Sequence, residues 1–532
     1  MSAEGRDSPR HGLIRSAGTA GSLTMVSRVL GYIRDSLNAA LFGAGWIADA
    51  YFVAFRIPNM FRDLVGEGAL SAAVIPTVTR AWARRGPREA FRLVSALLSV
   101  IAMGGAAVVL IGWLAAPLIV RIMAPGFSAL PEKFALTVVL TRILFPFIAF
   151  ISLASGVMGL LLSRQRLGPV AFAPVALNLC IIAAGAIACP LVGPDPSRQI
   201  YAWTAGVLIG GLVQWLVQVP AARALGFRFE WRTWHPGLGE IAALMVPAFF
   251  GLAITQVHLL VNTILASLLP GGSVAYLYYG NRLMQLPLGV VGVTLSMASY
   301  PIVARALAEG KPREAGKAVN HALSLVGFAV LPASAGLIAL APWINGLLFR
   351  FGRFTSADAS AAAAVASAYA IGIVGHSCLR ILTPPFYAAG RPYIPVITGA
   401  VGVLANILLS SWLMLKIGVV GLPLSTSAVT ILGALWLAVR LRTIIPGVGG
   451  SRVAASMARN LAASAAMGWA VFLVARWLAA NPAVMALPHK AAEALVTGAG
   501  IAAGAAIYAG LAWSLRFPEF RDILDAARRR RG

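Results

Sequence analysis

Charged residues are scarce in this sequence. Asp, Glu, Lys and Arg make up only 11% of its 532 residues, whereas hydrophobic residues make up 59%. A soluble domain is usually about a quarter charged, so this composition excludes an ordinary soluble protein. Acidic residues are scarcer than basic ones, 18 against 43, and the net charge is +25. No polar stretch is long enough to form a separate soluble catalytic domain.

Cysteine is almost absent as well. Cys180, Cys189 and Cys378 all lie in apolar stretches, without paired spacing and without a histidine at a metal-ligand interval. This pattern excludes a disulfide framework and predicts no metal site. The N-terminus lacks the pattern of a cleavable signal peptide, so residues 1–12 are expected to form a short polar tail ahead of the first span.

Long apolar runs are the dominant feature. A run of roughly 20 apolar residues can cross a bilayer as a helix, and fourteen such runs are predicted. The expected fold is therefore an all-α polytopic membrane protein with about 14 transmembrane helices. The predicted spans are 14–41, 47–79, 93–120, 134–162, 169–191, 200–222, 239–269, 274–304, 319–347, 361–388, 393–415, 419–440, 455–480 and 492–515.

The basic residues lie mainly in alternate connections between these spans. Lys and Arg gather in 80–92, 223–232, 305–317 and 440–459, and in the tail 528–531. The positive-inside rule places these segments, and hence both termini, in the cytoplasm. The net charge is thus interpreted as a topology signal and not as nucleic-acid binding. Contact of the tail with anionic lipid headgroups is the alternative.

An internal repeat organises the spans. Residues 50–81 match residues 275–306 without gaps, with ten of 32 positions identical, and the same offset of 225 pairs Arg166 with Arg391. The offset equals six spans, so it predicts two parallel six-helix halves followed by two further helices. The expected lobes are 1–222 and 223–441, with 442–532 appended. Transporters built from such halves bind substrate between them and alternate its access.

Seven arginines are predicted to lie inside spans. A charge at mid-bilayer costs at least about 3 kcal/mol, so these side chains must line a hydrated cavity, pair with carboxylates or reach the membrane surface. The seven are Arg28, Arg34, Arg56, Arg62, Arg142, Arg282 and Arg380.

The first two spans combine these arginines with acids. Arg28 and Asp35 are seven residues apart and share a helix face, whereas Arg34 points about 120° away. The second span carries Asp49 and Asp63, and Pro58 should bend it. A self-paired, neutral network that stabilises a bent helix pair is one interpretation of these charges.

Arg282 in the eighth span favours a different interpretation. Its neighbourhood offers only Asn281 and Gln285 as polar partners and no carboxylate. A surplus of guanidinium groups suits an anion, and a phosphate above all, because Arg can grip it with two parallel hydrogen bonds. The charges therefore predict an anionic substrate.

Other polar residues within spans have two interpretations each. Arg142 and Arg380 precede proline-broken stretches, so each could serve the cavity or satisfy carbonyl groups that the prolines free. Asn178 and Asn406 are expected to form hydrogen bonds between helices. His258 is either a proton carrier or a hydrogen-bonded core residue.

Three motifs resemble one transporter family. They read "SRVLGYIRD" at 27–35, "ADAYFVAFRIPNMFRDLVGEGALSAAVIP" at 48–76 and "YYGNRLMQLPLGVVGVTLS" at 278–296. The chain resembles the MurJ (MviN) family of bacterial lipid II flippases, which belongs to the superfamily of multidrug, oligosaccharidyl-lipid and polysaccharide exporters. The resemblance implies a 6+6+2 helix layout. It also implies that undecaprenyl-pyrophosphate-linked disaccharide-pentapeptide moves to the periplasmic leaflet of the bacterial cytoplasmic membrane.

The resemblance also implies roles for individual residues. Four arginines match the group proposed to hold the pyrophosphate, three acids match positions associated with the cavity and its gating, and the last two spans match a groove for the polyprenyl tail. The arginines are Arg28, Arg34, Arg62 and Arg282, the acids are Asp35, Asp49 and Glu67, and further candidates are Arg56, Asn281, Arg142 and Arg380.

Two departures from the family pattern matter. Asn281 stands where relatives often have an acid, and the spans that bind sodium in some relatives offer Glu240, His258 and Asn406 but no mid-membrane Asp. We therefore expect no cofactor and no sodium coupling. The membrane potential is the expected energy source, at about 2.3 kcal/mol per charge per 100 mV.

Three other functions are weighed against the same residues. The chain could export a different polysaccharide lipid or small drugs, or act as a scaffold for cell-wall enzymes. Expected partners are the lipid-linked substrate, membrane lipids and cell-wall synthesis proteins, and no nucleic acid. An enzyme is least compatible with the sequence, because no acid pair, nucleophile–base set or metal-ligand spacing lies at a membrane interface.

Overall fold

The computed structural model describes residues 9–529, apart from the side chains at 9–17, 65–67, 69, 72, 247–248, 250–255, 290, 523–524 and 526–529. Contacts divide the chain into two compact units. The first unit runs to Val274 and takes in Phe351–Phe354, and the second comprises Ala275–Arg350 and the chain from Thr355 on. Within residues 9–529 every regular element is a helix, as the sequence predicts.

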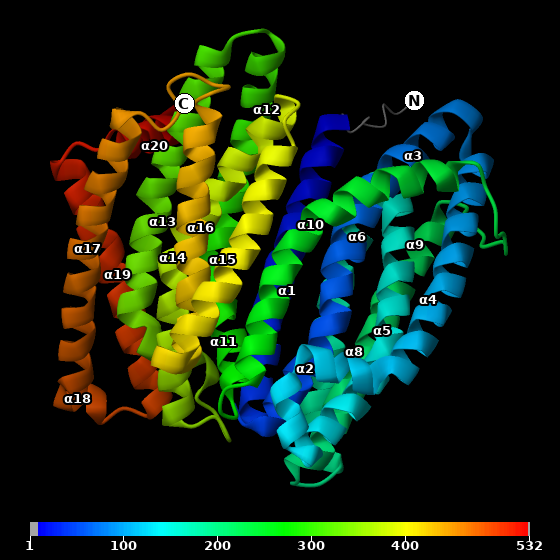
Figure 1. Ribbon diagram of the computed structural model, residues 1–532, viewed down its shortest axis with the longest axis horizontal. Coiled ribbons are helices and arrows are strands. Elements are labelled where there is room, and N and C mark those ends of the chain that lie inside the picture. The colour runs from blue at the N-terminus through cyan, green and yellow to red at the C-terminus, as the bar shows by residue number, and fades with distance from the viewer. Residues whose placement is uncertain (1–8, 530–532) are drawn as a thin grey trace, which may run out of the picture. The chain divides into compact units, whose positions relative to one another are not determined.

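The first unit is a bundle of long helices (Figure 1). Its elements are α1 (Pro9–Phe42), α2 (Trp46–Phe61), η1 (Arg62–Ala69), α3 (Leu70–Arg85), α4 (Pro87–Met123), η2 (Pro125–Ala129), α5 (Pro131–Ser163), α6 (Leu167–Ala183), η3 (Ala184–Ala188), α7 (Cys189–Leu191), α8 (Pro196–Leu216), α9 (Val219–Ala224) and α10 (Gly237–Ser267).

The second unit is a second helical bundle. Its elements are α11 (Ser273–Pro287), η4 (Leu288–Gly292), α12 (Val293–Ala308), α13 (Pro312–Phe349), α14 (Ser356–Ala388), α15 (Tyr393–Ile417), η5 (Gly418–Val420), α16 (Gly421–Leu441), α17 (Ser451–Ala480), α18 (Pro482–Met485), α19 (His489–Ser514) and α20 (Pro518–Arg529).

Helix ends follow local sequence signals. α14 begins with a capping box, in which Thr355 accepts a hydrogen bond from the backbone N–H of Asp358 and the Asp358 carboxylate accepts one from the backbone N–H of Thr355. The Asp195 side chain caps α8 by accepting from the N–H of Ser197. Such caps satisfy backbone donors that the first helical turn leaves unpaired.

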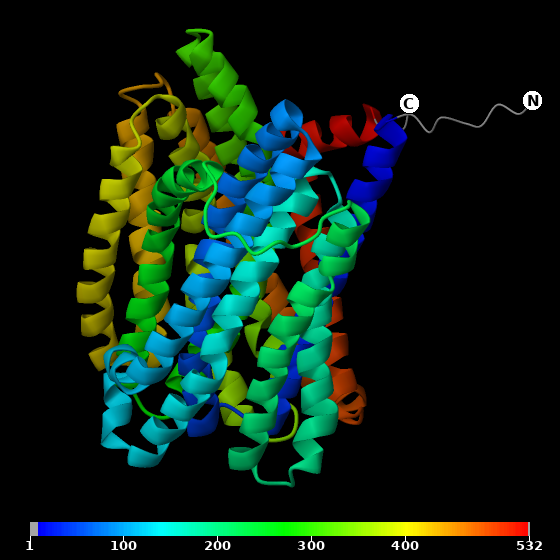
Figure 2. The ribbon, with the colours of Figure 1, turned by 90° about the vertical axis from the view of Figure 1, so that its right-hand side faces the viewer.

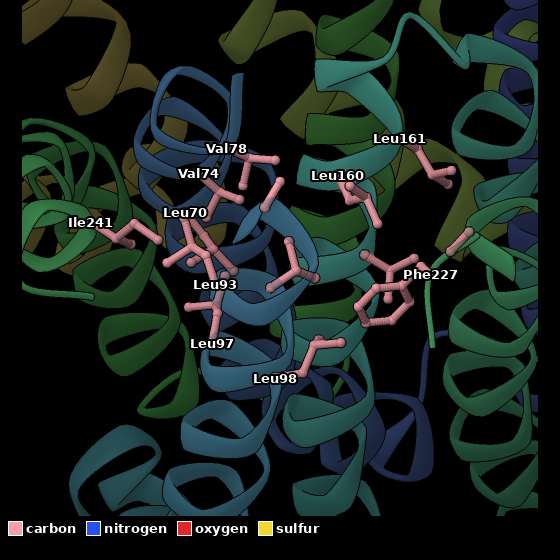
Figure 3. Packing of buried hydrophobic residues seen from close by; sticks show 14 of the residues in the cluster. Leu70, Val74, Val78, Leu93, Leu97, Leu98, Leu160, Leu161, Phe227 and Ile241 are labelled. Atoms are coloured by element: carbon pink, nitrogen blue, oxygen red, sulfur yellow. The ribbon is translucent and has the colours of Figure 1, made fainter. Parts of the chain in front are cut away.

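Helix α5 is central to the packing of the first unit, since it contacts α2, α3, α4 and α8. Leucine and valine side chains from α3, α4 and α5 interlock in one buried cluster with Phe227 and Ile241 (Figure 3). In the second unit, α14 packs on α13 and α16, and α17 packs on α13 and α19.

The outer helix faces are apolar. On α15, Val401, Leu404, Leu408, Trp412 and Leu415 are all more than half exposed. A contiguous apolar stripe of this kind marks an interaction surface in a soluble protein, whereas lipid tails cover it in a membrane protein. The exposed apolar face of α15 is therefore suited to contact with lipid.

The fourteen predicted spans correspond to observed helices. A helix, or an unbroken run of helices, covers most of every predicted range. Nine helical segments among the described residues are long and apolar enough to cross a membrane. Others, such as α1 and the α2–α3 and α11–α12 runs, carry ions or are shorter, so the total of fourteen crossings stays a prediction.

The internal repeat has a structural counterpart. Backbone of the π-helical type occupies η1 in the first unit and η4 in the second, at positions that the offset of 225 superimposes. Pro76 and Pro301, identical in the repeat, both lie inside the helix that follows. A π-helical turn widens the helix locally and is frequent at functional sites.

Contacts group α10 with the first unit, because it packs on η1, α3 and α4. The sequence-based division assigns this helix to the second lobe, 223–441. The repeat and the contacts therefore divide the chain at different places, and the three lobes 1–222, 223–441 and 442–532 stay a prediction.

Candidate functional site

Helix α1 positions the first group of charges. The Arg34 guanidinium donates two hydrogen bonds to Oδ1 of Asp35, from Nε at 2.9 Å and from Nη2 at 2.7 Å. The two side chains are 12% and 2% exposed. The sequence places Asp35 on the same face as Arg28, yet its carboxylate pairs with the neighbouring Arg34, because a long Arg side chain can fold back along the helix. The Arg28 side chain is exposed.

Asn178 in α6 completes this group. Its Oδ1 accepts a hydrogen bond from Nη1 of Arg34 at 3.2 Å, and its Nδ2 donates to the backbone oxygen of Ser27 at 3.1 Å. The prediction that Asn178 bonds between helices is confirmed. The sequence does not predict its contact with Arg34, and the one signal for it is an amide in an otherwise apolar run.

The second group of charges lies where α2 passes into η1. Nη2 of Arg62 donates to Oδ1 of Asp63 at 3.1 Å, and Oδ2 of Asp63 accepts from Nε2 of Gln256 in α10 at 3.4 Å. The Arg62 side chain remains 25% exposed. Pro58 lies inside α2, four residues before η1 begins, and the bend expected there stays a prediction. Arg56 is half-buried in α2.

Asp49 forms a buried ion pair near the start of α2. Its Oδ2 accepts from Nζ of Lys133 in α5 at 2.8 Å and from the backbone N–H of Gly272 at 2.7 Å. The side chains of Asp49 and Lys133 are 2% and 4% exposed. This carboxylate therefore ties α2 and α5 to the turn before α11. The side chain of Glu67, the third predicted acid, lies outside the described residues.

Arg282 and Asn281 belong to α11 in the second unit, where Arg282 is half-buried. Oδ1 of Asn281 accepts a hydrogen bond from Nε2 of Gln285 at 2.9 Å, one turn further along the helix. The structure thus brings Arg34 together with Asp35, and Arg62 with Asp63, inside the first unit. A single group of four arginines that includes Arg282 stays a prediction.

The comparisons with known proteins decide the family. The sequence pattern of the family described as "Lipid II flippase MurJ" matches residues 38–491. The chain belongs to the lipid II flippase MurJ family.

Relatives of this MurJ family member cover most of its length. The lipid II flippase MurJ of Burkholderia cenocepacia is 34% identical over 437 residues, which are 81% of this chain and 84% of the relative. A probable lipid II flippase MurJ of Rhizobium meliloti is 33% identical over 515 residues, 94% of either chain. The resemblance that the three motifs indicate is therefore confirmed.

Solved structures share the fold. A lipid II flippase MurJ in an inward closed conformation matches with a TM-score of 0.77 at 23% identity, over 95% of this chain and 99% of that one. An inward-facing multidrug resistance MATE family transporter of the MOP superfamily matches with a TM-score of 0.68 at 15% identity, over 83% of this chain and 98% of that one. The chain is an integral membrane protein with the polytopic helical fold of these transporters.

Arg142 donates a hydrogen bond to a backbone carbonyl of the neighbouring helix α4. Pro117 in α4 has no N–H, so it leaves the carbonyl of Trp113, four residues earlier, without its helical donor. Nε of Arg142 in α5 donates to that oxygen at 3.2 Å, and its guanidinium lies 4.8 Å from the Trp113 ring centroid. Of the two interpretations of Arg142, the contacts fit the satisfaction of a proline-freed carbonyl, although the proline belongs to the neighbouring helix.

A side chain from another helix also satisfies a proline-freed carbonyl at Arg380. Pro384 in α14 leaves the backbone carbonyl of Arg380 without its helical donor, and the Ser296 hydroxyl in α12 donates to it at 2.7 Å. The Arg380 side chain itself is exposed. Here a serine, and not the arginine, satisfies the freed carbonyl.

Other polar residues have structural partners. Nδ2 of Asn406 lies 3.2 Å from Oγ of Ser425 and 3.2 Å from Oγ1 of Thr426 in α16, which confirms its predicted bond between helices. Glu240 in α10 pairs with Arg80 in α3. His258 is half-buried in α10.

Proposed function

We propose that this chain moves lipid II, the undecaprenyl-pyrophosphate-linked disaccharide-pentapeptide, from the cytoplasmic to the periplasmic leaflet by alternating access. Membership of the lipid II flippase MurJ family supports this function. In this proposal the protein resides in the bacterial cytoplasmic membrane with both termini in the cytoplasm, as the basic connections predict.

The geometry of Arg34 carries the proposal for the site. Asp35 and Asn178 hold three of its nitrogen atoms, so the guanidinium plane is fixed before substrate arrives. A preorganised guanidinium binds phosphate oxygens with little loss of conformational entropy. Arg28 is exposed and Arg62 partly exposed, so both can approach a pyrophosphate. Together with Arg282 they are the proposed ligands of that group.

The decisive experiment measures lipid II translocation in reconstituted vesicles for Arg28→Ala, Arg34→Ala, Arg62→Ala and Arg282→Ala. Each variant should lose most of the transport and fail to support growth of cells depleted of their own flippase, while inserting normally. Arg84→Ala is the matched control, because Arg84 is an exposed arginine at the end of α3. If all four variants support growth, the assignment of the arginines is wrong.

The same vesicles test the energy source. We propose that the membrane potential drives transport without a cofactor and without sodium. Transport should rise when a potential, negative inside, is imposed and should not change when sodium replaces potassium. Dependence on sodium would contradict this part of the proposal.

A scaffold for cell-wall enzymes and an exporter of another lipid predict different results. A scaffold would neither bind lipid II through the arginines nor transport it. An exporter of a different polysaccharide lipid would transport that lipid in preference to lipid II. Cell-wall synthesis proteins are proposed partners of the flippase in addition to its lipid substrate.

A further inference from the structure

The loop between α9 and α10 carries three large exposed aromatic side chains. Phe229, Trp231 and Trp234 are 51%, 62% and 75% exposed. The same loop is basic, and by the positive-inside rule it lies on the cytoplasmic side. Exposed aromatic rings are costly in water, so this cluster needs a partner. The flippase function does not account for it.

The loop runs along α4 and does not project away from the protein. Backbone N–H groups of Glu230 and Arg232 donate to the hydroxyls of Ser95 and Ser99, at 3.3 and 3.1 Å. Those serines are one helical turn apart and fully buried. At the start of the loop, Phe227 is buried against Phe91 with ring centroids 5.7 Å apart. The loop is therefore held against α4 at three successive levels.

These contacts place the middle of the loop below the membrane surface, at the level of Ser99 in α4. Arg92 is the last basic residue before the predicted span, and Ser99 lies seven residues further along α4, about 10 Å deeper. The chain then returns, since His235 contacts Glu89 in the first turn of α4 at 3.3 Å. The loop therefore descends along α4 and comes back. Figure 2 shows it crossing in front of the helices of the first unit, below their upper ends.

The side chains of the loop are sorted by polarity. Successive residues of an extended segment point to opposite sides. Phe229 and Trp231 lie together, with ring centroids 6.2 Å apart. Glu230 and Arg232 neutralise each other, with Nη2 and Nε of Arg232 at 2.9 and 3.0 Å from Oε2 of Glu230. A neutral pair enters the membrane interface at a lower cost than a single charge.

A hollow opens beside the aromatic cluster. It has a volume of about 510 Å³ and is lined by Arg223, Gly226, Phe227, Arg228 and Phe229. Both arginines are exposed. Two guanidinium groups next to aromatic rings match a phosphodiester headgroup with its acyl chains.

We propose that the α9–α10 loop inserts into the cytoplasmic leaflet and binds the headgroup of an anionic phospholipid at Arg223 and Arg228. Phe229 and Trp231 lie at the boundary between headgroups and acyl chains, within the 5–10 Å that interfacial segments typically reach, whereas Trp234 lies nearer the aqueous side, next to His235. The loop anchors the first unit to the leaflet. This function is independent of lipid II transport.

The first test measures depth. A fluorophore is attached to Phe229→Cys, or to Trp231→Cys, in the full chain with Cys180, Cys189 and Cys378 replaced by Ala, in phosphatidylcholine nanodiscs. Nitroxide on the upper acyl chain should quench either label strongly, and iodide in the water weakly. A label at Arg88→Cys, an exposed position in the 80–92 connection, should show the reverse. If iodide quenches the loop labels as strongly as the label at position 88, the loop does not insert into the membrane.

The second test measures headgroup selectivity with the same label. Nitroxide-bearing phosphatidylglycerol should quench more than phosphatidylcholine at equal mole fraction, with an enrichment of about fivefold per arginine. Arg223→Ala with Arg228→Ala should abolish the difference, whereas Arg84→Ala with Arg88→Ala should preserve most of it. Equal quenching by both lipids, or equal losses in the two double variants, overturns the headgroup site. Neither test reads lipid II transport, so the proposed function is unaffected by its outcome.

Discussion

Arg34 holds the carboxylate of Asp35, the next residue in α1, with hydrogen bonds of 2.9 Å from Nε and 2.7 Å from Nη2. Adjacent helical side chains leave the axis about 100° apart, so the pair forms because the guanidinium folds back over the helix. The contact lowers the cost of two ions in a membrane helix. It also leaves Arg34 in a fixed orientation.

Arg34→Lys should therefore fail although it keeps the charge. An ammonium group is a point charge that lacks the planar fork, so it loses at least one of the bonds to Asp35 and Asn178. A hydrogen bond to a charged group is worth about 1.5–3 kcal/mol, and lipid II transport should fall by about tenfold or more. Transport assays in vesicles would measure the loss. Arg84→Lys at an exposed position should be neutral, and full transport by Arg34→Lys would contradict the orienting role.

Lys133→Met should strongly destabilise the first unit. It removes the partner of the buried Asp49 carboxylate, and breaking a buried ion pair typically costs about 3–5 kcal/mol. Thermal unfolding in detergent would report the loss. Adding Asp49→Asn should recover part of it, because the amide oxygen can still accept from the N–H of Gly272.

The control for this prediction is an exposed pair on the same unit. Nη1 of Arg85 lies 3.4 Å from Glu89, and the Arg85 side chain is 69% exposed. Arg85→Met should cost less than about 1 kcal/mol. Equal destabilisation by Lys133→Met and Arg85→Met would contradict a special role for the buried pair.

The sequence predicts the helices and the family, but it does not predict the ion pair between Lys133 and Asp49. Hydropathy places all fourteen helical segments, because burial in lipid depends on composition and length alone. The repeat aligns the two π-helical stretches with each other, although the sequence does not predict their π-helical form, and the motifs indicate the family. Nothing in the sequence indicates that α5 brings Lys133 to Asp49, because the two residues are 84 positions apart.

The sequence does not predict side-chain contacts that depend on how the helices pack or on which rotamer a long side chain adopts. The role of Arg142 requires Trp113 of the neighbouring helix to lie beside it, and the choice of Arg34 over Arg28 as the partner of Asp35 depends on rotamers. A helical wheel gives the direction of a Cβ atom but not the reach of a long side chain. Pairing within spans therefore needs coordinates.

Gly375→Ala should destabilise the second unit. A Cβ atom at this position in α14 would lie 2.7 Å from the backbone nitrogen of Ile431 in α16. Backbone atoms of a packed helix yield poorly, so overpacking should cost about 1–3 kcal/mol. The loss appears as a lower Tm in detergent.

Gly433→Ala in α16 is the matched control, and its Cβ atom would lie 3.9 Å from Cδ2 of Leu379 in α14. The same Cβ atom would lie 3.8 Å from a methyl group of Thr398, at ordinary contact distance. Because alanine favours helix over glycine by up to about 1 kcal/mol, Tm should stay constant or rise. A fall in Tm equal to that of Gly375→Ala would show that packing between α14 and α16 is not the cause.

Glu519 links α20 to α17 by hydrogen bonds, and Glu519→Ala should allow α20 to detach from α17. The Glu519 side chain is 6% exposed, and its carboxylate accepts hydrogen bonds from Oγ of Ser456 at 2.5 Å and from Nη2 of Arg459 at 2.9 Å. The Arg459 guanidinium also lies 4.3 Å from the ring centroid of Phe517. Glu519 and Phe517 lie at the junction between α19 and α20. Without the Glu519 carboxylate, α20 loses its hydrogen bonds to α17.

Limited proteolysis would measure this release. Since each hydrogen bond to a charged group contributes about 1.5–3 kcal/mol, local opening of α20 should increase at least about tenfold, and trypsin should cleave after Arg521 correspondingly faster. Arg521 is exposed, so cleavage there is limited by helix opening and not by burial of the side chain. Asp525→Ala changes an exposed acid of the same helix and should leave the cleavage rate near that of the unmodified chain. If the two variants are cleaved at equal rates, the attachment of α20 resides in its apolar contacts with α13, such as Phe520 with Phe328, and not in the buried carboxylate.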